Sequence, residues 1–451
     1  MSMHYDLLVI GTGVAGTSAA VAAADENKSV AIIDERPYGG TCPNRGCDPK
    51  KVMVGISQLY EQTKNNIGHG INGEVTLNWK DLKTFKDTFT HPVPESRENM
   101  YKEKGIHTYH SKGVLKDSHT VQAGSHTLTG DSIFIATGAK PSGLPIDGAE
   151  HLYTSDQFFE LEDLPPSIVF IGGGYISMEF AHLARAAGSE VVVFERSPMI
   201  LSDGFDYDVK TKLKESSEAK GIIIHTETNV TSIKQHDGMY TVEAKKDGRP
   251  ITLEADLVVH GAGRTPNIEN MGLDEVGISY TKQGIVVDST YQTYEFNHIY
   301  AAGDCAYTNE LPLTPVAGQE GSRAIEHLLY GTQPTTLPTH IPSIVFTYPP
   351  LASVGATEEQ LKKLGTDYDV LSKDLSGFFT YKRTNESTAY SKVLTDKSTG
   401  KLLGVHLLNS YSEHLINLFT LAIEKGMTKE EVKALTFVYP SAESDVASLF
   451  S

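Results

Sequence analysis

The sequence is poor in cysteine and tryptophan, and it carries fewer basic residues than acidic ones. Its 451 residues include 3 cysteines and 1 tryptophan, and 39 lysines and arginines stand against 57 aspartates and glutamates, for a formal net charge of −18. Such an acidic surface repels phosphate backbones and anionic lipids, so we expect neither a nucleic-acid nor a membrane partner. A structural zinc site usually needs four soft ligands, and the three cysteines of this chain do not supply them, so we expect no metal site.

Long hydrophobic runs are also missing. No apolar run reaches the roughly 20 residues that span a bilayer, and the first residues lack the basic region of a secretory signal. We therefore expect a cytoplasmic protein, in which a disulfide would be transient and catalytic rather than structural.

A dinucleotide-binding pattern opens the sequence. An apolar run over 5–10 leads into Gly11, Gly13 and Gly16, an alanine-rich helical segment follows, and a second apolar run ends at Asp34. The glycines allow a close backbone approach to a pyrophosphate, and the helix start offers free N–H groups. A carboxylate about 20 residues after the glycines suits a ribose diol, so we expect a nucleotide here.

The same unit recurs later in the chain. A run over 167–171 precedes Gly172 and Gly174, a helical segment extends to about 187, and a run over 190–195 ends at Glu195. Ser177 replaces the third glycine, which is a small residue that still fits a close contact between helix and strand. Two such units imply two dinucleotides, or one dinucleotide and one nucleotide-bearing prosthetic group.

Two cysteines, Cys42 and Cys47, follow the first glycine pattern directly. A thiol pair beside a nucleotide suggests electron transfer between a cofactor and sulfur, although two ordinary buried cysteines are the alternative. The pair precedes an expected helix, whose dipole lowers a thiol pKa, and Lys50 adds a positive charge nearby. Cys305 is expected to be a small buried residue.

In order and spacing, these motifs resemble the flavoprotein disulfide reductases, the family of glutathione reductase, dihydrolipoamide dehydrogenase and mercuric reductase. Further motifs that carry the resemblance are the strand end at 136–138, Gly263 with the residues that follow it, Asp304, and the segment 346–350. The resemblance covers nearly the whole chain. It implies an α/β fold with two Rossmann-like domains, for FAD and NAD(P), and a C-terminal α+β dimerisation domain.

The resemblance also implies domain limits and a homodimer. The FAD domain would comprise 1–145 and 263–335, the NAD(P) domain 146–262, and the dimerisation domain 338–451.

Site roles follow position by position from the same resemblance. Cys47 would be the sulfur on the flavin side and Cys42 the sulfur that attacks the substrate. Lys50 would lie near the flavin and pair with Glu179, and Tyr175 would cover the nicotinamide pocket. The residues implied in cofactor binding are Gly11, Gly13, Gly16, Asp34, Thr41, Lys50, Thr137, Gly138, Gly172, Gly174, Tyr175, Glu195, Arg196, Gly263, Asp304 and Ala317.

The C-terminal segment departs from the family pattern. Tyr439 stands where the family places a histidine that acts as base from the partner subunit, and Ser444 stands where a glutamate is expected. A phenol titrates near pH 10, about three units above neutrality, so it is a poor base but a usable proton donor. We therefore expect Tyr439 to orient or protonate a leaving group, with a packed interface aromatic as the alternative.

Other departures narrow the substrate. Val21 and Ser322 occupy positions where glutathione reductases carry arginines that hold peptide carboxylates. Residues 441–451 contain no cysteine, unlike the vicinal pair that ends mercuric reductases. The missing histidine also disfavours dithiol oxidation. For the nicotinamide, Glu195 favours NADH, whereas the adjacent Arg196 would suit NADPH; NADH is preferred.

We therefore expect an FAD-dependent NAD(P)H oxidoreductase that reduces a small disulfide or a thiol-reactive electrophile through Cys42 and Cys47. The alternatives are a diaphorase that reduces quinones at the flavin, and a redox-sensing flavoprotein with slow turnover.

Overall fold

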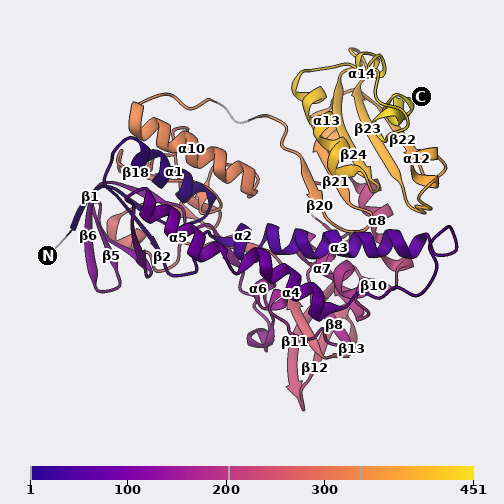
Figure 1. Cartoon of the computed structure of the whole chain (residues 1–451), viewed down its shortest axis with the longest axis horizontal. Coiled ribbons are helices and arrows are strands. Elements are labelled where there is room, and N and C mark those ends of the chain that lie inside the picture. The colour runs from indigo at the N-terminus through magenta and orange to yellow at the C-terminus, as the bar shows by residue number, and fades with distance from the viewer. Residues whose placement is uncertain (1–2, 202–203, 336–337, 451) are drawn as a thin grey trace. The chain divides into compact units, whose positions relative to one another are not determined.

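The computed structural model describes residues 3–201, 204–335 and 338–450. Contacts divide the chain into two compact units. Unit 1 comprises Met1–Lys50, Phe85–Ser142 and Arg264–Leu337, and unit 2 comprises Lys51–Thr84, Gly143–Gly263 and Pro338–Ser451. Helices α3 (Cys47–Asn65) and α4 (Trp79–Thr90) contribute residues to both units (Figure 1).

Unit 1 is built on a sheet with the strand order β3-β2-β1-β6-β5-β4. A seventh strand, β18, also pairs with β6 and stands outside this linear order. The pairings β1–β2, β2–β3, β1–β6 and β18–β6 are parallel, and β4–β5–β6 forms an antiparallel meander. The sheet strands are β1 (Met3–Ile10), β2 (Val30–Asp34), β3 (His107–His110), β4 (Gly113–Asp117), β5 (Thr120–Ala123), β6 (His126–Ile135) and β18 (Ile299–Ala301).

Helices and short strands complete unit 1. Its helices are α1 (Val14–Asp25), α2 (Thr41–Arg45), α5 (Val93–Glu103), α9 (Leu273–Val276) and α10 (Thr314–Tyr330). Its remaining strands are β7 (Ala139–Pro141), β15 (Arg264–Pro266), β16 (Tyr280–Thr281), β17 (Gly284–Val286) and β19 (Ala306–Tyr307). Helices α1 and α10 pack so closely that a Cβ on Gly321 would lie 2.7 Å from the Ala15 backbone.

Unit 2 contains a second parallel sheet, with the order β10-β9-β8-β14, and an antiparallel meander β11-β12-β13. These strands are β8 (Ser167–Ile171), β9 (Glu190–Phe194), β10 (Ile222–His225), β11 (Thr228–His236), β12 (Met239–Lys246), β13 (Arg249–Ala255) and β14 (Leu257–His260). The accompanying helices are η1 (Ala149–His151), α6 (Ser155–Phe159), α7 (Tyr175–Ala186) and α8 (Tyr207–Ala219).

The C-terminal part of unit 2 is an antiparallel sheet with the order β20-β21-β24-β23-β22, against which α13 packs. Its strands are β20 (Ser343–Val345), β21 (Leu351–Gly355), β22 (Tyr368–Asp374), β23 (Tyr390–Asp396) and β24 (Leu402–Leu408). Its helices are α11 (Glu358–Leu364), α12 (Phe379–Lys382), α13 (Ser412–Glu424), α14 (Lys429–Lys433) and η2 (Glu443–Phe450).

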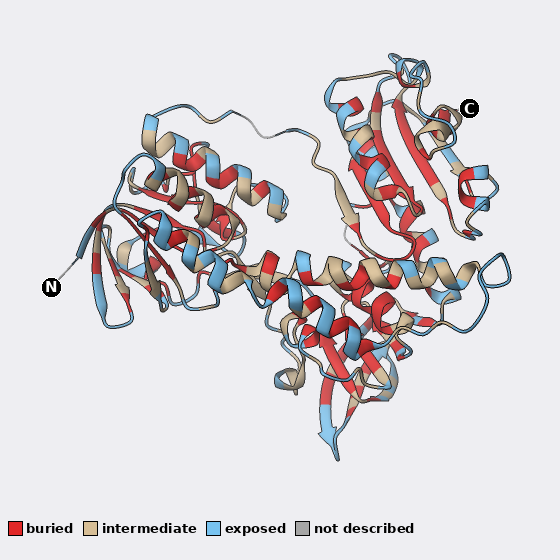
Figure 2. Ribbon diagram, in the orientation of Figure 1, coloured by how far each residue is buried: buried red, intermediate tan, exposed pale blue. Residues whose placement is uncertain are grey.

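Burial follows the sequence pattern. The apolar runs of β1, β2, β8 and β9 are almost wholly buried, as expected of parallel strands covered on both faces (Figure 2). The expected α/β fold with two Rossmann-like sheets and a C-terminal α+β part is confirmed. Within the described ranges, no helix is both long and apolar enough to cross a membrane.

An ion cluster around a buried lysine joins the start of α8 to the C-terminal part inside unit 2. The Lys392 ammonium lies 2.8 Å from Asp206, 2.7 Å from Asp208 and 2.6 Å from Glu358. Lys392 is 1% exposed, and such a cation is stable in the interior only when several acids surround it.

Candidate functional site

The first glycine loop of unit 1 leaves room for a ligand above its backbone. Gly11 has a φ of +111°, and a Cβ there would lie 2.1 Å from the Ala136 carbonyl oxygen. A Cβ on Gly16 would lie 2.1 Å from the Gly11 carbonyl oxygen, so the turn between β1 and α1 requires both glycines. A Cβ on Gly13 would meet nothing within 4 Å. The open side of the loop is therefore at Gly13.

Asp34 is held against this loop from the end of β2. Its Oδ2 accepts hydrogen bonds from the backbone N and the hydroxyl of Thr12, at 2.9 and 2.6 Å, and its Oδ1 accepts from Arg36 N at 2.9 Å. Gly13 precedes α1 without any side-chain cap, so the first N–H groups of the helix are free to bind an anion. The arrangement fits a pyrophosphate beside a ribose.

The thiol loop packs directly on the glycine loop. Gly40 has a φ of +74°, and a Cβ there would lie 2.4 Å from Gly13 Cα. Thr41 and Cys42 follow in the short helix α2, and α3 begins at Cys47. The two motifs that the sequence presents in series are thus neighbours in space within unit 1.

The two thiols differ in acidity. A hydrogen bond from Cys42 is the main reason that the pKa of Cys47 is lowered to about 6, and Thr314 and the Lys50 charge act in the same direction. The Thr314 hydroxyl lies 3.4 Å from Cys47 Sγ. That same hydrogen bond between the thiols, together with burial, raises the pKa of Cys42 above its ordinary range. Cys47 is therefore the thiolate of the pair near neutral pH, and the start of α3 favours that charge further.

Cys305 takes no part in this acid–base pair. Its side chain is 0% exposed, and burial raises its pKa to about 11. It follows Asp304, and its sulfur lies 3.4 Å from the carbonyl oxygens of Ile135 and Ala302. It packs as the small buried residue that the sequence predicts.

Asp304 and Ala317 lie on the same side of unit 1 as the end of β6. Burial raises the pKa of the Asp304 carboxyl, and the Arg264 charge only partly opposes this. The preceding Gly303 donates its N–H to Glu320 on α10 at 2.8 Å, and a Cβ on Gly303 would lie 3.3 Å from the Ala317 side chain. Helix α10 therefore fixes the turn that presents Asp304.

Thr137 and Gly138 follow β6 directly. Gly138 has a φ of +66°, and a Cβ there would meet nothing within 4 Å. The backbone at this turn therefore borders open space, as it does at Gly13. The Gly138 carbonyl oxygen accepts a hydrogen bond from Asn267 N at 2.9 Å. This contact ties the turn to the segment after Gly263, whose φ is +104°.

The second glycine loop lies in unit 2 and repeats the first. Gly172 has a φ of +94°, and a Cβ there would lie 2.7 Å from the Gly261 carbonyl oxygen. Gly174 precedes α7 without a side-chain cap. Ser177 fits in place of the third glycine because Gly261 faces it, and a Cβ on Gly261 would lie 1.6 Å from the serine hydroxyl oxygen.

Glu195 at the end of β9 plays the part that Asp34 plays in unit 1. Its Oε2 accepts from Gly173 N at 2.6 Å, and its Oε1 accepts from Ser197 N at 2.6 Å. Two backbone hydrogen bonds thus fix this carboxylate at the loop, whereas Arg196 is exposed. The fixed negative charge suits a ribose diol and opposes a 2′-phosphate.

Tyr175 and Glu179 are a turn apart on α7. Tyr175 is 45% exposed at the start of the helix, and Glu179 is fully buried. Glu179 Oε1 accepts a hydrogen bond from Phe346 N at 2.8 Å. The pairing of Glu179 with Lys50 stays a prediction, since these residues belong to different units.

Tyr439 lies between α14 and η2, with its side chain 77% exposed, and its neighbour Val438 is 80% exposed. Two adjacent large apolar side chains in water are unusual, and they suit a surface that another chain covers. In the described part of the chain, no group of three or more histidine, cysteine or acidic side chains is arranged to hold a metal ion.

Sequence reasoning missed Thr314 and Glu320, both on α10. Thr314 contacts the Cys47 sulfur, and Glu320 holds the backbone before Asp304. Neither belongs to a recognisable motif, because their roles arise only when α10 packs beside α1. The one signal available for Thr314 is the Pro315 that follows it, since proline is common in the first turn of a helix.

Comparisons with known proteins agree with this geometry. Residues 5–321 match the family model described as "Pyridine nucleotide-disulphide oxidoreductase". Residues 341–449 match the model described as "Pyridine nucleotide-disulphide oxidoreductase, dimerisation domain".

Relatives of similar length share about a third of the sequence. The chain is 33% identical to a glutathione reductase of Nostoc over 468 residues, covering 100% of both chains. It is also 33% identical to a dihydrolipoamide dehydrogenase of Chaetomium thermophilum over 450 residues, covering 97% of this chain and 88% of that protein.

Among solved structures, the chain is similar to the HOCl-induced flavoprotein disulfide reductase RclA from Escherichia coli. The TM-score is 0.88 at 25% identity, over 99% of both chains. A Cu(II) complex of a cysteine-to-serine mutant of RclA gives a TM-score of 0.89 at 25% identity, over 100% of this chain and 99% of that chain.

FAD and NAD(P)H are the typical cofactors of these relatives. The chain therefore belongs to the pyridine nucleotide-disulphide oxidoreductase family and is an NAD(P)H-dependent flavoprotein disulfide oxidoreductase that carries a dimerisation domain.

Proposed function

We propose that this enzyme passes electrons from NAD(P)H through FAD to Cys42 and Cys47, and from them to a small disulfide or a thiol-reactive electrophile. The observation that carries the proposal is the unequal acidity of the thiols, with the pKa of Cys47 lowered to about 6 and that of Cys42 raised. Such a pair supplies a thiolate at neutral pH and a neighbouring thiol that holds the proton.

FAD fits unit 1. We assign its pyrophosphate to the loop Gly11–Gly16 and to Thr41, its adenosine ribose to Asp34, and its ribityl chain to Asp304. At Gly13 and Gly138 the backbone is open, because a Cβ on either residue would meet nothing within 4 Å. Burial raises the pKa of the Asp304 carboxyl, and a ligand hydroxyl would give this buried group a hydrogen-bonding partner. When bound, FAD supplies the relay of an electron pair between a nicotinamide and the thiol pair.

Unit 2 supplies the nicotinamide site in this proposal. Gly172 and Gly174 would hold the pyrophosphate and Glu195 the ribose, while Tyr175 would cover the pocket. Because both carboxylate oxygens of Glu195 are fixed by backbone N–H groups, we favour NADH over NADPH. Arg196 is exposed and is the residue that would instead favour NADPH.

The chemistry at sulfur is a thiol–disulfide exchange. The Cys47 thiolate takes the proton from the Cys42 thiol, to which it is hydrogen-bonded. The Cys42 thiolate then attacks one sulfur of the substrate disulfide, so that one S–S bond breaks and a mixed disulfide forms. Cys47 passes its proton to the first substrate thiolate, and its own thiolate then attacks Cys42 Sγ. This step restores the Cys42–Cys47 disulfide and releases the second substrate sulfur as a thiolate, which takes a proton from water or from a neighbouring donor. The dithiol is oxidised and the substrate disulfide is reduced.

We propose a homodimer in which Tyr439 of a second copy protonates the leaving thiolate. The exposure of Val438 and Tyr439 supports a covering partner. The domain limits remain the proposal of 1–145 with 263–335 for FAD, 146–262 for NAD(P) and 338–451 for dimerisation. A cytoplasmic location is part of the same proposal, because a reducing compartment keeps an exchangeable thiol pair in use.

An anaerobic titration of the holoenzyme with NADH, and separately with NADPH, tests the proposal. Uptake of about four electrons, with a long-wavelength thiolate–flavin band at the halfway point, means that flavin and disulfide both cycle. Uptake of two electrons without that band contradicts the proposal and favours a diaphorase or a sensor.

Serine variants of Cys42 and Cys47 separate the remaining alternatives. The disulfide reductase loses substrate reduction and keeps its flavin, whereas a diaphorase keeps quinone reduction. A redox sensor turns over slowly even as the wild type.

A copper ion is a second acceptor class, because RclA was solved as a Cu(II) complex and thiolates favour Cu(I), the product of its reduction. The Cys42–Cys47 dithiol would give one electron to each of two Cu(II) ions, lose two protons and become the disulfide. Cu(II) reduction that needs Cys42 and Cys47 would support this class.

A further inference from the structure

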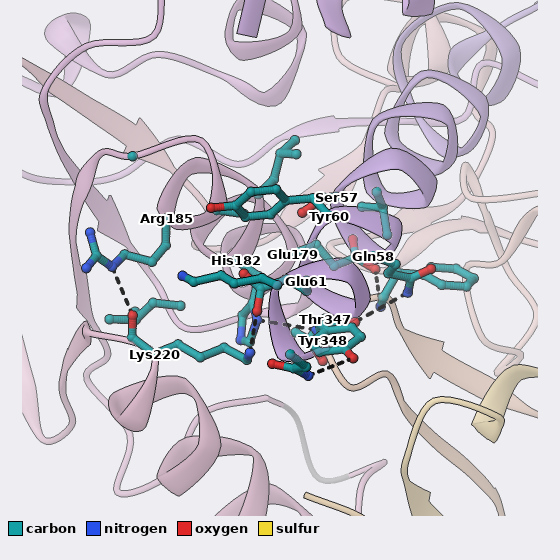
Figure 3. A pocket seen from close by; sticks show the side chains of 18 of the residues that line it. Ser57, Gln58, Tyr60, Glu61, Glu179, His182, Arg185, Lys220, Thr347 and Tyr348 are labelled. Carbon is teal, nitrogen blue, oxygen red and sulfur yellow. Dashed lines mark hydrogen bonds and ion pairs between the residues drawn. The ribbon is translucent and has the colours of Figure 1, made fainter. Parts of the chain in front are cut away.

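Unit 2 contains a cavity of about 400 Å³ to which no function has been assigned above, although Glu179, the expected partner of Lys50, lines it (Figure 3). It lies beside one face of α3, the second half of α7, the end of α8 and the residues 346–348 before β21. Protein sites for small molecules usually measure about 300–1,000 Å³, so the cavity is large enough for a ligand. It lies away from the glycine loop at Gly172 and Gly174, which is not among its lining residues.

The lining is unusual for a strongly acidic chain because cations prevail there. Lys64, Arg185 and Lys220 line the cavity together with the acids Glu61 and Glu179. Glu179 is fully buried and accepts a hydrogen bond from Phe346 N, so it does not face solvent. The lining therefore carries three cations against two carboxylates, one of them buried, although the whole chain has a net charge of −18.

The cations are held in position by their neighbours. Lys220 Nζ lies 2.6 Å from Glu61 Oε2 and 4.7 Å from the centre of the Tyr348 ring, and its side chain is 24% exposed. Arg185 donates Nε to the Lys220 carbonyl oxygen at 2.9 Å, which fixes the backbone that carries this lysine. Lys64 Nζ lies 5.8 Å from the centre of the Tyr60 ring. Aromatic faces hold ammonium groups without neutralising them.

His182 forms part of the wall and stays neutral. Its Nδ1 accepts from Tyr348 N at 3.3 Å, and its Nε2 is 2.9 Å from the Ser217 hydroxyl. Burial first, and then the Lys220 charge, lower the pKa of His182 to about 3. The imidazole therefore adds no charge to the cavity.

Neutral polar groups complete the wall. Gln58 Nε2 lies 3.5 Å from the Thr347 carbonyl oxygen, and Asn65 donates to the Tyr348 hydroxyl at 3.2 Å. Side chains of this kind offer further hydrogen bonds to oxygen atoms of a ligand.

We propose that this cavity binds a small anion with carboxylate or phosphate groups, through Lys64 and Lys220. The anion would exchange with Glu61 as the partner of Lys220, and charge-assisted hydrogen bonds from two ammonium groups would hold its oxygens. Helix α7 carries Arg185, which lines the cavity, and also Glu179, the expected partner of Lys50. An anion that shifts this helix would therefore change the position of Glu179, so we assign the anion the role of an effector of turnover. This role rests on the proposed function.

Calorimetric titration of the holoenzyme tests the binding, with inorganic phosphate and citrate as probes and saturating NAD⁺ present. We expect one saturable site per chain with a Kd of about 1 mM or lower, and Lys64→Gln should weaken binding about tenfold, or about 1.4 kcal/mol. Lys234→Gln is the matched control: it removes an exposed cation of unit 2 that does not line the cavity and should leave the Kd unchanged.

Three outcomes overturn the site: no saturable heat with either probe, full affinity in Lys64→Gln, or an equal loss of affinity in Lys234→Gln. Lys220→Gln is a second variant for the same comparison. If it fails to fold, Lys64→Gln decides the question, because this side chain is exposed. Binding with unchanged turnover at saturating anion overturns the effector role and leaves the proposed function intact.

Discussion

The hydrogen bond between the two thiols makes a quantitative prediction about Cys47. Replacing Cys42 by alanine removes the donor that contributes most to lowering the pKa of Cys47. A hydrogen bond to a charged group is worth about 1.5–3 kcal/mol, and one pKa unit corresponds to about 1.4 kcal/mol, so Cys42→Ala should raise this pKa by about one to two units. Cys47 is exposed, so we expect the lower half of that range.

Cys42→Ser is the matched control, because a serine hydroxyl keeps a donor at the same position. Thr314, Lys50 and the start of α3, which lower the pKa of Cys47, remain in both variants, and so does the burial that raises it. The serine variant should therefore titrate below the alanine variant.

The assay is the rate of alkylation by iodoacetamide as a function of pH, measured on each holoenzyme variant. Cys305 is 0% exposed and should not react, and a Cys42→Ala, Cys47→Ser double variant measures any background. Equal midpoints in the alanine and serine variants, or a lower midpoint in the alanine variant, would refute the reasoning. The Cys47 thiolate would then owe its stability to Lys50 and the helix rather than to Cys42.

Three further predictions concern unit 2. Lys392→Met leaves the buried Asp206 and the partly exposed Asp208 and Glu358 without their cation and should destabilise the protein by about 3–5 kcal/mol at pH 7. Lys362 and then Lys392 lower the pKa of Glu358 to about 2, so the part of the Tm loss that Glu358 causes should shrink as the pH falls from about 4.5 toward 2. Burial raises the pKa of Glu386 to about 7, so the wild type should lose up to about 3 kcal/mol relative to Glu386→Gln as the pH rises from about 4.5 to above 7, and an equal pH dependence of Tm in both proteins would contradict this. Glu195→Ala should lower kcat/KM for NADH about tenfold and leave or improve that for NADPH, whereas Arg196→Gln should spare NADH; steady-state kinetics with both nucleotides decide this.

Local patterns in the sequence predict the nucleotide loops well. The apolar run before Gly11, the spacing of the glycines and the acid at Asp34 are set within about 30 residues, so a βαβ unit is legible without knowledge of the rest of the chain. The same holds for the second loop, including Ser177. The helix that starts at Cys47 is likewise encoded locally.

Local sequence patterns do not predict the contacts between distant segments. The approach of Gly40 to Gly13, which brings the thiol loop onto the nucleotide loop, depends on how two turns pack. The role of Tyr439 stays a prediction, since it concerns a second chain.

The sequence by itself determined the two dinucleotide loops, the thiol pair and the family to which they belong, because each is a short pattern whose chemistry needs particular residue types at fixed spacing. Through the resemblance, the sequence also marked Cys47 as the sulfur on the flavin side. Only the tertiary structure decided which groups lower its pKa, the Cys42 thiol first and then Thr314 and Lys50. Thr314 lies 267 positions from Cys47 in the chain, and it reaches the sulfur because α10 packs against α1. The cationic cavity is likewise a product of packing: α3, α7 and the end of α8 each bring one cation, and no single segment shows that they meet.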